Sequence, residues 1–230
     1  MRLASLKKKG FEVMDELIAR FEKLDTTCVS DAMDKLGIEC CAFGIKPLHF
    51  GQKICGRAYT VHYAPCGAVK GTVGDFLDEV KPGMVVVIDN AGREDCTVWG
   101  DIMAKTAKQK GVAGTVIDGV CRDIPAVLSC GYPMFSKGYY MRTGKDRVYA
   151  DACQVPVTLG NVQVRPGDII LADDSGVVVI PQSCAEQAAG IAESIDEAEQ
   201  KILALVAQGI PLAQARQETG YHHLQTRPEG

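Results

Sequence analysis

The chain has 230 residues, of which 47% are hydrophobic and 23% charged, the profile of an ordinary globular protein. A chain of this length can bury a core without disulfides. The net charge is −4, from 25 basic and 29 acidic residues, and no basic stripe alternates with aromatic residues. The composition therefore argues against nucleic acid as a partner, because phosphate binding needs clustered Lys and Arg.

No apolar run reaches the roughly 18 residues that a membrane span requires, and the N-terminus lacks the order of segments of a signal peptide. The ten cysteines include no Cys-x-x-Cys pair, so the sequence does not indicate a zinc site. Most of them lie among Val, Ala and Gly, which is typical of small apolar residues in a reducing compartment. We expect a soluble, cytoplasmic protein without a membrane partner.

Two helices are predicted near the N-terminus. Over residues 11–24, apolar side chains recur at helical spacing; they are Met14, Leu17, Ile18, Phe21 and Leu24. A second helix is expected over residues 31–36, with Thr26, Thr27 or Ser30 as its cap and Gly37 as its end.

Short β-rich runs separated by turns follow these helices. Strands are predicted at residues 54–63, 84–89, 114–118, 169–172 and 177–181. The last two read as a hairpin. A helical segment at residues 101–110, ended by Gly111, separates the second strand from the third. Strand, helix and strand over this length predict a βαβ unit with a parallel pair.

The C-terminal part is Ala- and Glu-rich and helical in period over residues 185–208. Residues 216–230 lose this periodicity, and we expect them to form a flexible tail. No repeat and no low-complexity linker interrupts the chain. We therefore predict a single α/β domain over residues 1–230, with helical extensions.

The segment from Trp99 to Asp123 carries the candidate chemistry. In open α/β folds ligands bind at the carboxyl ends of strands, and here Gly100 and Asp101 open a helix whose first-turn N–H groups suit an anion. The next strand ends just before Arg122 and Asp123. Arginine presents a fork of donors for a carboxylate or an enolate oxygen, and Asp123 and Asp101 are hard oxygen ligands suited to Mg²⁺.

The same residues also have a purely structural interpretation. An Arg-Asp pair after a strand is often a surface ion pair, and an aspartate at the start of a helix is often only a cap. From physical chemistry alone, both interpretations stay open.

A resemblance favours the functional interpretation. Asp101, twenty intervening residues, and then Arg122-Asp123 match the D-x20-R-D signature. The chain thereby resembles class II pyruvate aldolases of the 4-hydroxy-4-methyl-2-oxoglutarate and 4-carboxy-4-hydroxy-2-oxoadipate type, a family that also contains the regulator of ribonuclease activity A. Further segments resemble the family in the same order along the chain, namely residues 29–32, 111–119 and 166–181. The resemblance as a whole extends over roughly residues 25–210.

The resemblance implies an α/β fold of the swivelling β/β/α type, an αββα sandwich with N- and C-terminal helices. It also implies a homotrimer or homohexamer with sites at subunit interfaces. Mg²⁺ or Mn²⁺ would be the cofactor, bound directly by Asp123, while Asp101 would hold a water on the metal. Arg122 would steady the pyruvate enolate.

Other site residues follow from the resemblance as well. Backbone amides at the start of the helix would bind the pyruvate end of the substrate; they belong to Gly100, Asp101, Ile102 and Met103. A glutamate from the C-terminal helix of a neighbouring subunit would assist, and the alignment indicates Glu199, with Glu197 nearly as well placed.

The resemblance thus predicts a metal-dependent lyase that cleaves a 4-hydroxy-2-oxo acid to pyruvate and a second oxo acid, with oxaloacetate decarboxylation as a side activity. Two alternatives remain open. The first is a non-catalytic, protein-binding regulator like the ribonuclease inhibitor of the same family, and the second is a lyase or hydratase acting on another oxo acid or sugar acid. A regulator has no physical need for Asp101, Arg122 and Asp123 together, so these residues favour an enzyme.

Overall fold

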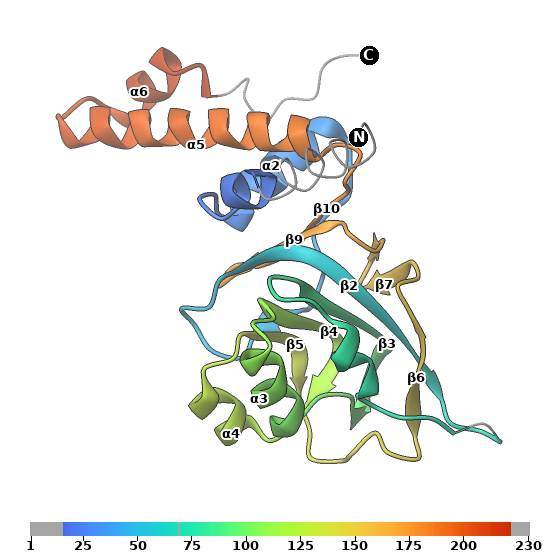
Figure 1. Cartoon of the computed structure of the whole chain (residues 1–230). Helices are drawn as coiled ribbons and strands as arrows, with labels where there is room; N and C mark the ends of the chain where they lie inside the picture. Colours follow the sequence, from blue (N-terminus) through green and yellow to red (C-terminus); the bar gives the residue numbers. More distant parts are fainter. Residues whose placement is uncertain (1–15, 69, 222–230) are drawn as a thin grey trace, which may run out of the picture. The chain divides into compact units, whose positions relative to one another are not determined.

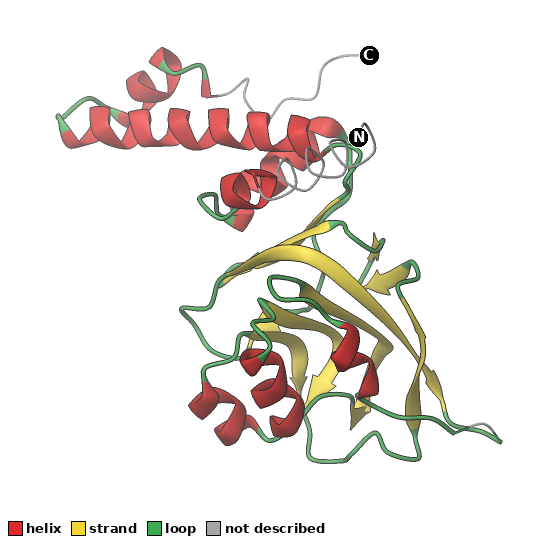
Figure 2. Cartoon of the chain, viewed as in Figure 1, coloured by secondary structure: helices red, strands yellow, loops and turns green. Residues whose placement is uncertain are grey.

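The computed structural model describes residues 16–68 and 70–221 of the chain. The chain divides into two compact units: a helical unit of Met1–Cys40 and Ser183–Gly230, and a sheet unit of Cys41–Gln182. In Figure 2 the described part of the helical unit consists of helices and loops, and the named strands all belong to the sheet unit. The prediction of one domain over residues 1–230 stays a prediction.

An eight-stranded sheet forms the framework of the sheet unit (Figure 1). Its strand order is β1-β5-β4-β3-β2-β9-β10, and β6 also pairs with β2. The strands are β1 (Lys46–Pro47), β2 (Ile54–Pro65), β3 (Val85–Thr97), β4 (Gly114–Cys121), β5 (Met134–Tyr139), β6 (Val148–Cys153), β9 (Ile169–Asp173) and β10 (Gly176–Ile180). All five predicted strands are present, and the predicted hairpin is the antiparallel pair of β9 and β10.

The centre of the sheet is parallel, with β2 beside β3, β3 beside β4 and β4 beside β5. Parallel strands are covered on both faces and therefore need continuous apolar sequence. This explains why all eight residues of β4 are buried, as are the first six of β3. The predicted βαβ unit is confirmed, because α3 (Asp101–Gln109) connects β3 to β4.

Two hydrophobic clusters define the layers of the sheet unit. One cluster joins the central strands to α3 and to α4 (Ile124–Cys130), through side chains that include Ala104, Ala107 and Val127. The other cluster joins the opposite face of the sheet to β9, to β10 and to the hairpin of β7 (Val157–Leu159) and β8 (Val162–Val164). The result is the predicted α/β class with β, β and α layers.

β3 is longer than the sequence predicted. The sequence predicted a strand that ends at Asp89, but the strand continues to Thr97. It keeps its pairing with β4 across two register shifts, the first between Asp89 and Arg93 and the second between Arg93 and Thr97. The predicted end of this strand was therefore wrong, and β3 leads almost directly into the start of α3.

The helical unit contains the predicted N-terminal helices. Residues 16–21 are helical, and Leu17, Phe21 and Leu24 are buried as their spacing predicted, whereas Met14 lies outside the described residues. The next helix, α2, spans Thr26–Leu36 and ends at Gly37 as expected. Its cap is Asp25, not one of the three predicted residues, because the Asp25 carboxylate accepts a hydrogen bond from the Cys28 N–H at 2.7 Å.

Two further helices complete the helical unit. α5 spans Ala185–Ala207, close to the predicted bounds, and buries a stripe of mostly small residues against its neighbours. α6 spans Leu212–Glu218, so residues 216–218 are helical where a tail was expected. The burial of Ala215 accounts for this extra turn. The rest of the predicted tail, residues 222–230, lies outside the described residues.

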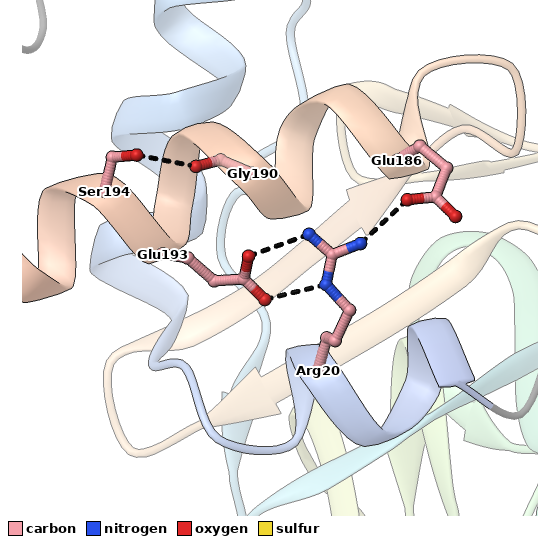
Figure 3. Close-up of polar contacts among 5 residues, drawn as sticks. All are labelled: Arg20, Glu186, Gly190, Glu193 and Ser194. Carbon is pink, nitrogen blue, oxygen red and sulfur yellow. Dashed lines mark hydrogen bonds and ion pairs between the residues drawn. The ribbon is translucent and has the colours of Figure 1, made fainter.

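Arg20 ties the first helix of this unit to α5 (Figure 3). Its guanidinium donates to both carboxylate oxygens of Glu193, from Nε at 2.7 Å and from Nη2 at 2.8 Å, and Nη1 donates to Glu186 at 2.7 Å. The hydrogen bond from Arg20 holds the pKa of the Glu193 carboxyl below its usual value. A bidentate pair is the strongest geometry for such a contact.

We predict that this bidentate contact between Arg20 and Glu193 makes the free energy of unfolding depend on pH in the acidic range. Because the folded-state pKa of Glu193 is lowered, its contribution is present above the unfolded-state pKa and is lost as pH falls through the folded-state pKa. In Arg20→Met the stability should no longer fall with decreasing pH on account of Glu193. The same variant should be less stable than the wild type at neutral pH by at most about 1 kcal/mol, since the pair is partly exposed. Urea unfolding of the full chain between pH 3 and pH 8 would measure both effects.

Lys201→Met, which removes an exposed positive charge from the same helix α5, is the control for the change in net charge. An acid-side loss of stability of equal size in the wild type and in Arg20→Met would contradict the assignment to the Arg20–Glu193 pair.

Candidate active site

The ends of β3 and β4 bring the predicted residues Asp101, Arg122 and Asp123 together. The Asp101 N–H donates to Asp123 Oδ2 at 3.2 Å, and Arg122 Nε lies 3.3 Å from the same oxygen. The Arg122 N–H donates to the Trp99 carbonyl at 3.0 Å, which fastens the end of β4 to the segment that leads into α3. The side chains of Arg122 and Asp123 are 38% and 36% exposed, so a ligand can reach them.

Gly100 makes this approach possible because it has no side chain. A Cβ atom at this position would lie 2.6 Å from Asp123 Oδ2 and 3.2 Å from Arg122 Nε. The Gly100 backbone is extended, with φ −143°, so the requirement is for space and not for an unusual conformation. The group that approaches the Gly100 backbone closely is the Asp123 carboxylate.

Asp123 itself occupies the left-handed region, with φ 61° and ψ 35°. An aspartate tolerates this region better than most residues, at a cost of about 1–3 kcal/mol. Asp123 directly precedes α4, but its side chain makes no capping hydrogen bond to that helix. Its carboxylate instead turns toward Gly100 and Asp101.

The first turn of α3 is available for an anion. Its cap residue, Gly100, has no side chain to cap it, the Asp101 N–H donates to Asp123 Oδ2, and the N–H groups of the first turn carry partial positive charge. Ile102 is 76% exposed, which is unusual for a large apolar residue and indicates an open first turn. Ile102 and Met103 both line the cleft described below.

Lys105, which the sequence analysis did not select, holds Asp101. Its Nζ donates to Asp101 Oδ2 at 2.6 Å from one turn further along α3. This hydrogen bond holds the pKa of the Asp101 carboxyl below its usual value, so Asp101 stays ionised under ordinary conditions. The four-residue spacing between an acidic and a basic residue is a sequence signal that could have identified the pair.

Asp101, Arg122 and Asp123 line one cleft of about 550 Å³ in the sheet unit. Its wall includes the segment from Gly71 to Asp75. The lining residues are Gly71, Thr72, Val73, Gly74, Asp75, Leu77, Asp78, Thr97, Val98, Trp99, Gly100, Asp101, Ile102, Met103, Thr106, Arg122, Asp123, Thr143 and Lys145. Every substrate-binding residue predicted from the sequence is among them.

Trp99 both lines the cleft and packs in the core. Its ring stacks on Tyr132 with centroids 6.1 Å apart and an interplanar angle of 7°, and the residue is only 2% exposed. The indole Nε1 is buried without a hydrogen-bond partner among the described residues. Trp99 therefore contributes to the site chiefly through its packing in the core.

Comparison with known protein families identifies the family to which this chain belongs. The model of the family named RraA-like, described as Aldolase/RraA, matches residues 26–179. The chain belongs to the RraA-like family. That range contains all of the residues that converge on Gly100.

Individual relatives agree with the family assignment. This RraA-like chain is 40% identical over 214 residues to Protein DlpA of Legionella pneumophila, covering 91% of this chain but only 35% of that protein, so it spans about a third of that relative. It is 36% identical to a protein of Halalkalibacterium halodurans named "Putative 4-hydroxy-4-methyl-2-oxoglutarate aldolase", covering 82% of this chain and 89% of that one.

A solved structure shares the fold. It is RraAS2 of Streptomyces coelicolor, titled an unusual member of the RNase ES inhibitor RraA protein family. The TM-score is 0.76 with 31% identity, and the match covers 80% of this chain and 94% of that chain. The RraA-like family therefore includes proteins named as aldolases and proteins named as ribonuclease inhibitors.

The two candidate glutamates lie on α5 of the helical unit, whereas the residues that line the cleft belong to the sheet unit. Glu199 is half-buried, and its Oε2 accepts a hydrogen bond from Cys28 Sγ at 3.7 Å. Burial raises the pKa of the Glu199 carboxyl, and the charges of Asp25 and Asp31 add to the effect. Glu197 is exposed.

The RraA-like cleft has the donors that a hard divalent cation requires. Asp101 and Asp123 present two carboxylates, which suits Mg²⁺ because this ion usually binds one or two carboxylates and keeps several waters. The cleft is lined by four carboxylates and two cations, a net charge of −2 that a divalent cation would balance. Among the described residues no group of three or more His, Cys, Asp or Glu side chains could hold a metal, so a site saturated by protein ligands is not found there.

Two further features of the described residues are their cysteines and the hydropathy of their helices. None of the ten cysteines, all of which lie within the described residues, forms a disulfide. Within residues 16–68 and 70–221, no helix is both long enough and apolar enough to cross a membrane.

We predict that Lys105 sets the ionisation of Asp101. Lys105→Met removes the hydrogen bond that lowers the Asp101 pKa, so this pKa should rise toward the usual aspartate value. Carbon-13 NMR of the side-chain carboxyls would measure the titration. Lys108→Met, on the same helix, is the control. An Asp101 pKa unchanged by Lys105→Met, or an equal change in the control, would contradict the assignment.

Proposed function

We propose that the chain is a divalent-metal-dependent lyase that cleaves a 4-hydroxy-2-oxo acid into pyruvate and a second oxo acid. The observation that carries this proposal is the convergence of Arg122, Asp123 and Asp101 with the open first turn of α3 in one cleft. An arginine, two carboxylates and an anion-binding helix end are the parts that metal-assisted carbon–carbon cleavage needs. The relative named as an aldolase supports the same reaction.

Asp123 and Asp101 would hold Mg²⁺ or Mn²⁺. When bound, the ion supplies a Lewis acid that withdraws electrons from the 2-oxo group. Asp123 is the direct ligand in this proposal, and Asp101 is the second carboxylate, kept ionised by Lys105.

The protein groups around the ion bind and orient the substrate. In this proposal the N–H groups of Ile102 and Met103, in the first turn of α3, bind the carboxylate of the pyruvate end. Gly100 keeps the space beside Asp123 clear. Arg122 lies next to the point where negative charge develops, and its guanidinium stabilises the enolate oxygen.

Bond cleavage requires a base for the C4 hydroxyl. In this proposal Glu199 of a neighbouring subunit accepts that proton as the C3–C4 bond breaks. The C4 carbon leaves as the carbonyl of the second oxo acid, the bonding electrons form the pyruvate enolate, and protonation at C3 completes pyruvate. The raised pKa of Glu199 suits this role, because a base works best when its pKa approaches the working pH.

The same site would decarboxylate oxaloacetate as a side activity. There the C3–C4 bond breaks to release CO₂, and the electrons form the same enolate, so Arg122 stabilises the same developing charge. The role of Glu199 further requires an oligomer in which α5 of one subunit reaches the cleft of another, and we propose a homotrimer or homohexamer.

The family also provides a second candidate function, a non-catalytic regulator that binds a protein partner. The observation that favours it is the 31% identity to RraAS2, a member of the RNase ES inhibitor RraA family. A binding protein does not need Asp123 in a strained left-handed conformation beside Gly100. A lyase or hydratase on another oxo acid or sugar acid would use the same residues, and the choice of substrate would distinguish it.

We predict that Arg122→Ala and Asp123→Ala each nearly abolish pyruvate release from 4-hydroxy-4-methyl-2-oxoglutarate. Loss of Arg122 removes the stabilisation of the enolate and should lower kcat by about 100-fold or more; loss of Asp123 removes the direct metal ligand. A coupled dehydrogenase assay would follow pyruvate.

The matched control is the Arg93–Asp95 ion pair on β3, which has a 2.9 Å contact but does not line the cleft. Arg93→Ala and Asp95→Ala should retain activity. Turnover like that of the wild type in either cleft variant would exclude the mechanism.

We further predict that Glu199, and not Glu197, is the assisting glutamate. Glu199→Gln keeps the size of the side chain but cannot accept the proton, and general-base loss typically costs about 100-fold or more in rate. Glu197→Gln should change the rate little, because Glu197 is exposed on α5. The opposite order of the two variants in the pyruvate assay would assign the role to Glu197.

A further inference from the structure

Glu199 lies at the edge of the face that α5 buries in the helical unit. Ile195 and Ile202, four residues before it and three after it, are both buried, and side chains at these spacings share one face of a helix. Glu199 is half-buried, whereas Glu197 is exposed. Glu199 is therefore on the side of α5 that packs with α2 (Figure 1).

Cys28 is the residue of α2 that contacts Glu199. Its Sγ donates a hydrogen bond to Glu199 Oε2 at 3.7 Å. Cys28 is only 2% exposed, and its N–H donates at 2.7 Å to Asp25, the residue that caps α2. The cap fixes the backbone of Cys28 and burial confines its side chain, so the thiol has a defined position beside the carboxylate.

The surroundings of Cys28 keep its thiol protonated. Burial raises the pKa of the Cys28 thiol well above its ordinary value, and the negative charges of Asp25, Glu199 and Asp196 add to the effect. An ionised carboxylate can only accept hydrogen bonds, so a thiol that keeps its proton contacts it as a donor. Cys28 therefore donates to Glu199 throughout the neutral pH range.

The hydrogen bond from Cys28 opposes the other groups that face Glu199. Burial raises the pKa of the Glu199 carboxyl, and so do the charges of Asp25 and Asp31 on the side of α2 and of Asp196 on α5 itself. The hydrogen bond from the Cys28 thiol lowers the same pKa. The thiol thus favours the ionised carboxylate, which is the form that can accept a proton.

Glu193, on the same helix, shows what a stronger partner does to a carboxylate. Arg20 binds it with two hydrogen bonds and holds its pKa below the usual value (Figure 3). A carboxylate held in this way is a poor base, because a base works best when its pKa approaches the working pH. A thiol is a weak, uncharged donor, so it contacts Glu199 without making the carboxylate a poor base.

We propose that Cys28 is a positioning residue for Glu199: its thiol binds Oε2 and keeps the carboxylate ionised, ready to accept the proton of the C4 hydroxyl. This inference rests on the proposed function, in which Glu199 is the base for carbon–carbon cleavage in the cleft of a neighbouring subunit. Cys28 acts through Glu199 and need not touch the substrate.

The direct test is the titration of Glu199 in the full chain, followed by carbon-13 NMR of the side-chain carboxyls, with Glu199→Gln to assign the resonance. Cys28→Ala removes the donor, so the pKa of Glu199 should rise above its wild-type value. Cys28→Ser supplies a hydroxyl donor of similar size and should prevent that rise. Val29→Ala is the matched control, because it removes buried side-chain volume from α2 but no donor, and it should leave the titration unchanged.

The second readout is the pH dependence of pyruvate release from 4-hydroxy-4-methyl-2-oxoglutarate in Mg²⁺. A base must be ionised to act, so a higher pKa of Glu199 moves the acid limb of the kcat profile to higher pH. On that limb Cys28→Ala should be about threefold slower than the wild type, the scale of one weak hydrogen bond, and at high pH the two rates should converge. Cys28→Ser and Val29→Ala should not move the limb to higher pH.

The outcomes separate this inference from the proposed function. If Cys28→Ala leaves the pKa of Glu199 or the acid limb unchanged, or if Val29→Ala shifts them equally, the role of Cys28 is overturned while the lyase stands. If the folded wild type releases no pyruvate at any pH, the proposed function fails and the inference fails with it.

Discussion

The site depends on one close approach, that of the Gly100 backbone to the Asp123 carboxylate. A Cβ atom at Gly100 would lie 2.6 Å from Asp123 Oδ2, so the two strand ends meet only because that atom is absent. Two hydrogen bonds then join the ends, one from the Asp101 N–H to Asp123 and one from the Arg122 N–H to the Trp99 carbonyl. The parallel pairing of β3 and β4 determines where these ends lie. The stacking of Trp99 on Tyr132 stabilises the segment that leads into α3.

The charges of the cleft follow from that arrangement. Asp123, although strained, directs its carboxylate away from α4 and toward the start of α3, and Lys105 keeps Asp101 ionised beside it. In the proposed function an anionic substrate binds beside these carboxylates, and the repulsion between the like charges is unfavourable unless a cation lies between them. The divalent ion that we propose would balance these charges, and Arg122 would then face the charge that develops during the proposed cleavage. A protein that only binds a partner gains nothing from such an arrangement.

The sequence predicts the parts of this structure whose signals are local. Apolar runs identify β3 and β4, helical spacing identifies α5, and the resemblance carried by the D-x20-R-D spacing predicts that Asp101 and Arg122 lie together. Prediction from the sequence fails where the structure depends on contacts between residues far apart in the chain. The sequence predicted that β3 ends at Asp89, yet pairing with β4 continues the strand to Thr97. Lys145 lines the cleft without any local signal, because the bridge between Thr97 and Thr143 that brings its segment to the cleft joins residues far apart in the sequence.

The central claim is that the cleft performs metal-dependent cleavage at the 2-oxo acid. Its most direct test is pyruvate release by the purified wild-type chain from 4-hydroxy-4-methyl-2-oxoglutarate and from oxaloacetate, with Mg²⁺, after EDTA, and after Mg²⁺ is restored. The account predicts release with Mg²⁺, its loss in EDTA and its recovery on adding the ion back. Release that is unaffected by EDTA, or no release from either substrate by folded protein, would contradict it.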